Sequence, residues 1–202
     1  TQAALACLTP PHLTCMFLDC GGFSNAYQNA VRNGGAFELK QATWAFGQAK
    51  LSPEAIENPI VKAALDEIEI EKWFQRLPWK RGHSPLQWVP DYENYLFDQW
   101  THADFDDFWK QVGICAELYY DEFSDVPQFH MGGWYDPYNV TTTNNYLGLS
   151  QKKTGPVHLL MGPWTHGAHD SSFAGDVDFG QAAVVKTNLA EDYNELRLRW
   201  FD

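Results

Sequence analysis

Two short apolar runs in the second half of the chain are each followed by a polar residue that could take part in chemistry. The runs cover 126–132 and 157–161, and glycine ends each of them. Apolar runs of this length between turn residues are typical of strands buried inside a sheet. Asp136 follows the first run and His166 follows the second. Because ligands of open α/β sheets lie beyond the carboxyl ends of the strands, we expect both side chains to project into a binding site.

The flanking pattern places helices around these strands. Residues 1–8 form an apolar helix that ends before Pro10-Pro11, and 12–18 form a further buried strand. Another helix is predicted over 138–149, and a last one over 189–200, where apolar residues recur at helical spacing. The order is helix, strand, helical insertion, strand, helix, strand, helix. This order predicts an α/β fold, the second half of a doubly wound sheet.

The long segment before the second strand contains helix signals and no convincing strand. Ser52-Pro53 and Asn58-Pro59 each place a capping residue before proline, which is typical of a helix N-terminus. The helix after Asn58 presents one apolar face and is expected to end at Leu77-Pro78. Short helices are expected over 91–100 and 104–111.

These signals divide the chain into three parts. We predict a helical cap over 45–125, inserted between core segments 1–44 and 126–202. Insertions at the carboxyl edge of a sheet commonly act as lids over the site.

Composition and charge exclude several classes of partner. The net charge is −12 and no basic cluster is present, which argues against binding to nucleic acid or to an anionic membrane. Solubility is the simplest reason for this charge. No run approaches the roughly 18 apolar residues of a membrane span. Nine tryptophans exceed what a core usually needs, which indicates that some of them line a pocket.

The cysteines and acids do not predict a metal site. The four cysteines show neither a C-x-x-C pair nor zinc-ligand spacing, so buried free thiols are expected, with a disulfide as the less supported alternative. Asp176 and Asp178 lie in a glycine-flanked loop that weakly resembles a calcium site, but they supply too few ligands. We expect no metal and no cofactor.

Four sequence motifs resemble those of one group of enzymes. They are Gly-Gly-Trp-Tyr-Asp at 132–136, Gly-Pro-Trp-Thr-His at 162–166, Gly-Asp-Val-Asp-Phe-Gly at 175–180 and His-Ala-Asp-Phe-Asp-Asp-Phe-Trp at 102–109. The chain resembles the cocaine-esterase and X-Pro dipeptidyl-peptidase group of α/β-hydrolases, which includes the α-amino acid ester hydrolases and glutaryl acylases. The resemblance covers nearly the whole chain and is weakest in the cap.

The resemblance implies a Ser-Asp-His triad, with Asp136 as the acid and His166 as the general base. The chemistry has the same requirement, because a serine hydroxyl is a poor nucleophile until an imidazole accepts its proton. Asp136 could also cap the helix that follows it. His169 lies close to His166 in the chain, but the Gly-Pro-Trp-x-His motif favours His166. His130 is expected to be a packed core residue.

The nucleophile is the missing member of the triad. In the family it lies in a Gly-x-Ser-Tyr-x-Gly-x-Thr-Gln turn, and Thr1-Gln2 resembles the end of that pattern. We therefore expect the serine five residues before Thr1, in a longer polypeptide of which this chain is an inactive internal part. Ser24, in Gly22-Phe23-Ser24-Asn25-Ala26, is the alternative. It would require a further strand before residue 126, which the pattern lacks, and it could instead be a helix cap.

Several residues are candidates for binding the substrate. In the family the counterpart of Tyr138 would face the pocket. Trp164, with Trp44 and Trp88, could form an aromatic acyl pocket, although each is more often a core residue. Asp106 and Asp107 lie at the edge of the cap, near the point where carboxylates bind the substrate ammonium in the α-amino acid ester hydrolases. A solvated helix face is the more common role for such acids.

The sequence thus predicts a serine hydrolase for an ester or amide, either acyl or X-Pro dipeptidyl, of a small molecule or short peptide. A non-catalytic α/β-hydrolase-like binding domain and an interaction domain are the alternatives. The family usually continues into a β-sandwich domain, and without that domain exposed apolar surface would favour a homo-oligomer. No motif decides the compartment, and the cytoplasm is our expectation.

Overall fold

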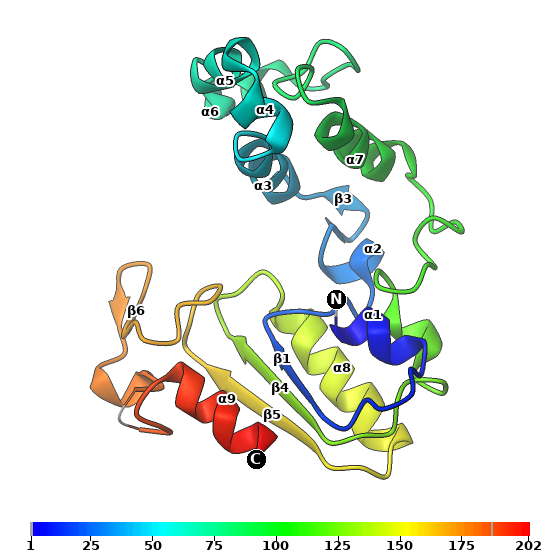
Figure 1. Ribbon diagram of the computed structural model, residues 1–202, viewed down its shortest axis with the longest axis vertical. Helices are drawn as coiled ribbons and strands as arrows, with labels where there is room; N and C mark the ends of the chain where they lie inside the picture. Colours follow the sequence, from blue (N-terminus) through cyan, green and yellow to red (C-terminus); the bar gives the residue numbers. More distant parts are fainter. Residues whose placement is uncertain (1, 187) are drawn as a thin grey trace. The chain divides into compact units, whose positions relative to one another are not determined.

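Three parallel strands form the central sheet of the described chain. The computed structural model describes residues 2–186 and 188–202. Strands β1 (Met16–Asp19), β4 (Gln128–Gly133) and β5 (Val157–Gly162) lie in the order β1-β4-β5, and both neighbouring pairs are parallel (Figure 1). Leu18 is in register with His130, and His130 with Leu159. All three strands therefore end at one edge of the sheet.

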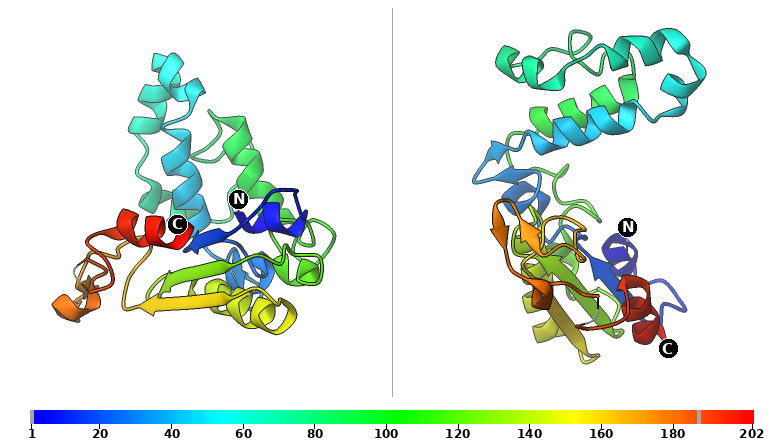
Figure 2. Two further views of the ribbon diagram at one scale, coloured as in Figure 1. Left: turned by 60° about the horizontal axis from the view of Figure 1, so that its bottom comes forward. Right: turned by 90° about the vertical axis from the view of Figure 1, so that its left-hand side faces the viewer.

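Helices cover both faces of this sheet, because successive side chains of a strand point to opposite faces. Met16 and Leu18 pack with α1 (Gln2–Cys7) and with Leu149 of α8 (Asn139–Lys152). Phe17 packs on the other face with α9 (Tyr193–Phe201) (Figures 1 and 2). A parallel sheet between helices is an α/β arrangement, as the order of predicted elements indicated.

Short elements complete the part of the chain formed by 1–34 and 106–202, which is one of two compact units. They are α2 (Ala26–Asn29), β2 (Arg32–Asn33), η2 (Ala116–Tyr119), β6 (Phe173–Ala174), β7 (Val177–Asp178) and η3 (Gln181–Ala183). Strand β7, within the Gly-Asp-Val-Asp-Phe-Gly segment, pairs antiparallel with β6, which directly precedes that segment.

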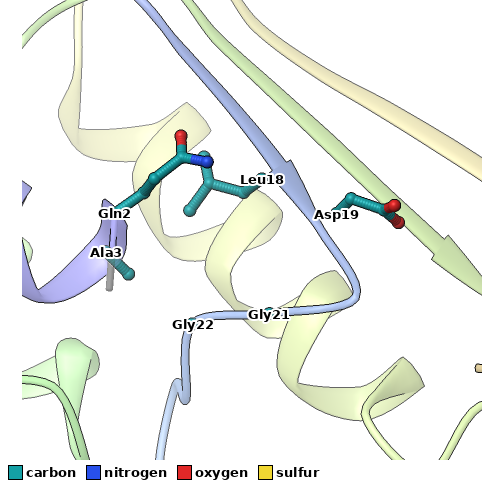
Figure 3. A pocket seen from close by; sticks show the side chains of 6 residues that line it. All are labelled: Gln2, Ala3, Leu18, Asp19, Gly21 and Gly22. Atoms are coloured by element: carbon teal, nitrogen blue, oxygen red, sulfur yellow. The ribbon is translucent and has the colours of Figure 1, made fainter. Parts of the chain in front are cut away.

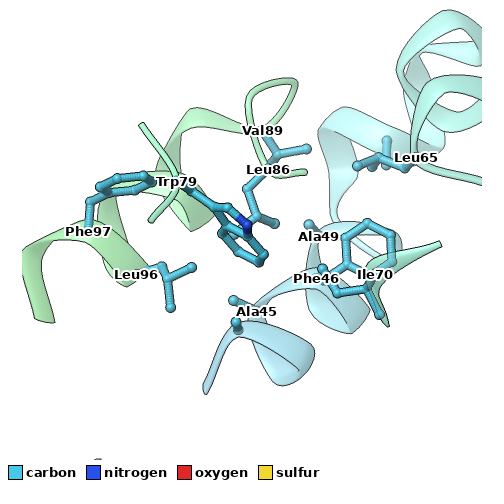
Figure 4. Packing of buried hydrophobic residues seen from close by; sticks show 12 residues of the cluster. Ala45, Phe46, Ala49, Leu65, Ile70, Trp79, Leu86, Val89, Leu96 and Phe97 are labelled. Carbon is cyan, nitrogen blue, oxygen red and sulfur yellow. The ribbon is translucent and has the colours of Figure 1, made fainter. Parts of the chain in front are cut away.

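The second compact unit, 35–105, is mainly helical. Its elements are β3 (Ala36–Phe37), α3 (Lys40–Ala49), α4 (Pro53–Glu57), α5 (Pro59–Asp66), α6 (Ile70–Trp73), η1 (Phe74–Arg76) and α7 (Pro90–Thr101). Their apolar faces share one core around Trp79, Leu86 and Leu96 (Figure 4). Ser52 and Asn58 cap α4 and α5 as predicted.

Two helix predictions in this region are wrong. The helix after Asn58 does not continue to Leu77-Pro78 but ends at Asp66, and α6 and η1 follow as separate turns. Ile60, one of the apolar residues of the predicted helix after Asn58, is 75% exposed. Residues 104–111 form turns, because the Asp106 side chain accepts a hydrogen bond from the Phe108 amide and the Trp109 amide bonds to the Asp106 carbonyl.

The limits of the helical unit also differ from the expected insertion over 45–125. Residues 106–125 belong to the unit that contains the sheet, where Ala116, Tyr120 and Phe123 pack in the same core as α1. At the other end, residues 35–44 belong to the helical unit because α3 begins at Lys40.

Candidate active site

The two glycine-rich motifs interlock beyond the ends of β4 and β5. The Trp134 amide donates to the Gly162 carbonyl at 2.8 Å, and the Tyr135 amide donates to the Trp164 carbonyl at 3.0 Å. A Cβ on Gly133 would lie 2.1 Å from the Trp164 carbonyl oxygen, and one on Gly162 would lie 2.4 Å from the Trp164 ring. Only glycine permits this approach, which brings residues 136 and 166 together.

Asp136 and His166 form a hydrogen-bonded pair at this edge of the sheet. Nδ1 of His166 lies 2.8 Å from Oδ2 of Asp136. The other carboxylate oxygen accepts the Tyr138 amide at 2.7 Å, which fixes the carboxylate in a turn. The Asp136 side chain is 1% exposed, whereas the His166 side chain is 57% exposed. The acid is thus held inside the protein while the imidazole remains accessible.

The surroundings favour the charged form of both groups. Burial by itself raises the pKa of the Asp136 carboxyl, but hydrogen bonds from His166, the Tyr138 amide and Cys20 outweigh burial and hold the pKa below its usual value. The hydrogen bond to Asp136 raises the pKa of His166 above its usual value, against the opposing effect of burial. An imidazole supported in this way is suited to accept a proton.

Asp19 and His169 form a second aspartate–histidine pair near the first. Nε2 of His169 lies 3.0 Å from Oδ1 of Asp19, and the Tyr193 hydroxyl donates to Oδ2 of Asp19 at 2.6 Å. The His169 ring stacks on the Tyr193 ring with centroids 4.9 Å apart, and its edge faces Trp164. The pair thereby ties the end of β1 to the loop after His166 and to α9.

Cys20 lies between the two pairs. Its thiol sulfur is within 4.8 Å of ligand atoms of Asp19 and His169, and also of Asp136 and His166. Burial raises the pKa of this thiol, and the neighbouring Asp136 carboxylate raises it further. The group is therefore a neutral thiol rather than a nucleophilic thiolate.

Comparison with known protein families identifies the family to which the chain belongs. The model of the X-Pro dipeptidyl-peptidase (S15 family) matches residues 1–168. The chain belongs to this family. The resemblance inferred from the motifs is thus confirmed, and membership in a peptidase family supports a hydrolytic function. Comparison with curated proteins finds no match.

The aromatic residues predicted to bind substrate in this S15-family chain have different surroundings. Tyr138 lies against the site, with its ring 5.3 Å from the His166 ring. Trp164 is 3% exposed, donates its indole N–H to the Ala183 carbonyl and packs in the core beside Phe17, so it supports the loop from within. Trp44 and Trp88 belong to the helical unit, and each is about half exposed.

The two acids proposed to bind an ammonium group have local partners. Asp106 accepts the Phe108 amide at 3.0 Å, and Asp107 pairs with Lys110 at 3.0 Å. The Asp107 side chain is 99% exposed. Neither of these contacts involves the Asp136–His166 pair.

Ser24 does not have the surroundings of a nucleophile. It is fully buried, and its hydroxyl oxygen lies 3.3 Å from Oδ1 of Asn29 and 3.5 Å from the Thr141 hydroxyl. A nucleophile must instead be accessible to substrate and within reach of the base. The capping residue of the following helix is Asn25, whose side chain accepts the Tyr27 and Gln28 amides.

The structure also tests the predictions for the helix cap, His130, the cysteines and membrane spans. Asp136 does not cap α8, because Tyr138 is the N-cap residue and Asp136 instead forms the turn before the helix. His130 is a packed core residue as expected. All four cysteines are free thiols. None of the helices in the described part of the chain is both long and apolar enough to cross a lipid bilayer.

A pocket of about 200 Å³ adjoins β1 on the side of α1. Its lining includes Gln2, Ala3 and Leu18. Leu18 points toward Gln2 and Ala3, whereas the Asp19 carboxylate points to the other side of the strand (Figure 3). Asp19 also lines the pocket, which therefore borders the cluster of titratable groups around Cys20.

Proposed function

We propose that this chain supplies the acid and the base of a serine hydrolase that cleaves an ester or amide bond, either acyl or X-Pro dipeptidyl. The observation that carries the proposal is the 2.8 Å contact between His166 Nδ1 and Asp136 Oδ2 within a chain of the S15 family. A half-exposed imidazole backed by a buried carboxylate is the arrangement that activates a serine hydroxyl.

The proposed reaction uses each residue in a defined way. His166 accepts the proton of the serine hydroxyl through Nε2 while the serine attacks the carbonyl carbon of the substrate. Asp136 holds the Nδ1–H tautomer and stabilises the imidazolium that forms. His166 then passes the proton to the leaving group, and water hydrolyses the acyl-enzyme by the same route.

The nucleophile in this proposal is the serine expected five residues before Thr1, and the substrate is a small molecule or short peptide. The buried position of Ser24 supports this choice over an internal nucleophile. The helical unit is proposed as the cap of the enzyme, because it is inserted in the chain between β1 and β4.

A fluorophosphonate probe on the polypeptide that carries both the upstream serine and this chain tests the proposal. We expect covalent labelling at that serine, and a loss of hydrolysis and labelling of at least about 10³-fold on His166→Ala. His83→Ala, an exposed histidine of the helical unit, is the matched control and should change neither. Labelling at Ser24, or hydrolysis that survives His166→Ala, would contradict the assignment. Absence of labelling would favour a binding domain.

A further inference from the structure

Four potential metal ligands surround the thiol of Cys20, which is itself a fifth. Asp19, Cys20 and His169 form one group, and Cys20, Asp136 and His166 form another, each with its ligand atoms within 4.8 Å of one another. Cys20 follows β1 directly and has a left-handed backbone conformation with φ of 46°. Its amide donates to the Met131 carbonyl of the neighbouring strand at 2.9 Å, so the main chain that carries the thiol is fixed.

The charge of the cluster suits a cation. The Asp136 side chain is 1% exposed and the Asp19 side chain is 19% exposed, and both carboxylates lie within 4.8 Å of the Cys20 sulfur. Among the described residues, the ion pairs of these two carboxylates are with His169 and His166 and not with a lysine or arginine. The two carboxylates beside the thiol thus have no permanent positive charge as a direct partner.

We propose that Cys20, Asp136 and His166 bind a thiophilic divalent cation such as Zn²⁺, with water as the fourth ligand. Thiolate, imidazole and carboxylate are the ligands that Zn²⁺ prefers, and three protein ligands leave one position open. Ca²⁺ and Mg²⁺ take oxygen ligands and are not expected here. The ion supplies the positive charge that favours the thiolate.

The geometry makes binding of the ion incompatible with the Asp136–His166 hydrogen bond. Ligand atoms around a tetrahedral Zn²⁺ lie roughly 3.3–3.7 Å apart, given its usual bond lengths. His166 Nδ1 and Asp136 Oδ2, now 2.8 Å apart, must separate as the ion enters between them, and Cys20 must move closer. The thiol proton and the Nδ1 proton leave to solvent. If the proposed function holds, the ion therefore inhibits hydrolysis reversibly.

Accessibility favours this group over the one that contains Asp19. The His166 side chain is 57% exposed, so an ion from solvent can reach it directly. The His169 side chain is 6% exposed and stacked on Tyr193, which also binds the Asp19 carboxylate. An ion at the Asp19 group would have to disrupt this packed arrangement.

Titration of the purified protein with Co²⁺, a spectroscopic substitute for Zn²⁺, tests the binding site without any measurement of activity. We expect a thiolate-to-cobalt absorption band that Zn²⁺ abolishes, and affinities at least about tenfold weaker in Cys20→Ser and in His166→Gln. The matched controls, Cys15→Ser and His169→Gln, should keep the band. Absence of the band would overturn the proposal. A band that is lost in Cys15→Ser or His169→Gln but kept in Cys20→Ser and His166→Gln would also overturn it. If Cys20→Ser fails to fold by thermal unfolding, the pair His166→Gln and His169→Gln decides.

A second measurement tests inhibition on the polypeptide that carries the nucleophile. Cys20→Ser, compared with its own rate in the absence of metal, should lose at least about tenfold in sensitivity to Zn²⁺. Unchanged sensitivity of this variant would contradict the inhibitory role of the site. Cobalt binding without any hydrolysis would leave the metal site standing and reject the proposed function alone.

Discussion

His166 Nδ1 lies 2.8 Å from Asp136 Oδ2, although the two residues are 30 positions apart in the chain. The contact exists because parallel strands β4 and β5 end at the same edge of the sheet and their glycines let the two loops cross. Everything proposed for the chemistry of this chain depends on that contact, and the predictions begin with it.

Asp136→Asn should lower the hydrolytic rate of the polypeptide that carries the nucleophile by roughly 10⁴-fold, with the fold preserved. An asparagine amide favours the wrong imidazole tautomer and cannot stabilise the imidazolium. Steady-state kinetics and circular dichroism check this result. Asp121→Asn, at a carboxylate that is 77% exposed, is the control and should have little effect. A loss below tenfold for Asp136→Asn would mean that Asp136 is not the acid.

Tyr193→Phe should destabilise the protein by about 1.5–3 kcal/mol. The substitution removes a hydrogen bond of 2.6 Å to the ionised Asp19 carboxylate without changing the ring that stacks on His169. Urea denaturation measures the difference. Tyr135→Phe, at a ring that is 53% exposed, is the matched control and should change the free energy of unfolding by less than about 0.5 kcal/mol. Equal effects of the two substitutions would show that the Asp19 arrangement adds no stability.

Two helical glycines should respond oppositely to alanine. A Cβ on Gly148 of α8 would lie 2.1 Å from the Tyr120 ring, so Gly148→Ala should destabilise by about 1–3 kcal/mol through overpacking. Gly47 of α3 has no atom within 4 Å of such a Cβ, so Gly47→Ala should stabilise by about 0.5–1 kcal/mol. Thermal or urea unfolding of both variants checks the pair. The same sign for both would contradict the packing of α8 against Tyr120.

His130 should make the stability of the protein fall in mild acid. Burial lowers the pKa of His130 from 6.5 to about 4, so the folded state keeps it neutral where the unfolded chain takes up a proton. The stability present above pH 6.5 is therefore lost progressively as the pH falls toward 4, by about 2 kcal/mol between pH 7 and pH 5.

The non-titrating variant His130→Gln measures this effect, because carboxyl groups titrate equally in both proteins. The difference in the free energy of unfolding between wild type and His130→Gln should change by about 2 kcal/mol from pH 7 to pH 5. A pH-independent difference for His130→Gln would show that His130 is not held neutral.

Local pattern was sufficient to predict the main elements of the sheet unit. Glycine and proline mark the ends of β4 and β5, and an apolar run between such residues has few alternatives to a buried strand. The motifs that end in Asp136 and His166 identified the family, which the match over 1–168 confirms. Prediction was poorer over 59–76 and 104–111, because side chain–backbone bonds and short turns there compete with helical propensity.

The second aspartate–histidine pair could have been suspected from the same rule that singled out Asp136. Asp19-Cys20-Gly21 follows a buried strand just as Asp136 follows β4, and both would be expected at the carboxyl edge. The residues of the proposed metal site lie at positions 20, 136 and 166, so no local spacing reveals them. Zinc motifs are recognised from sequence only where the ligands are close in the chain.

By itself, the sequence determined the three strands and the main helices of the sheet unit, and which family supplies the chemistry. Hydrophobic periodicity, capping residues and the two glycine motifs are local properties. Only the tertiary structure decided that His169 meets Asp19 across 150 residues, and that Cys20 lies between two aspartate–histidine pairs. It also decided that Trp164 supports the loop from the core. These contacts depend on the order of the strands and on how closely their loops pack, and neither is encoded by neighbouring residues alone.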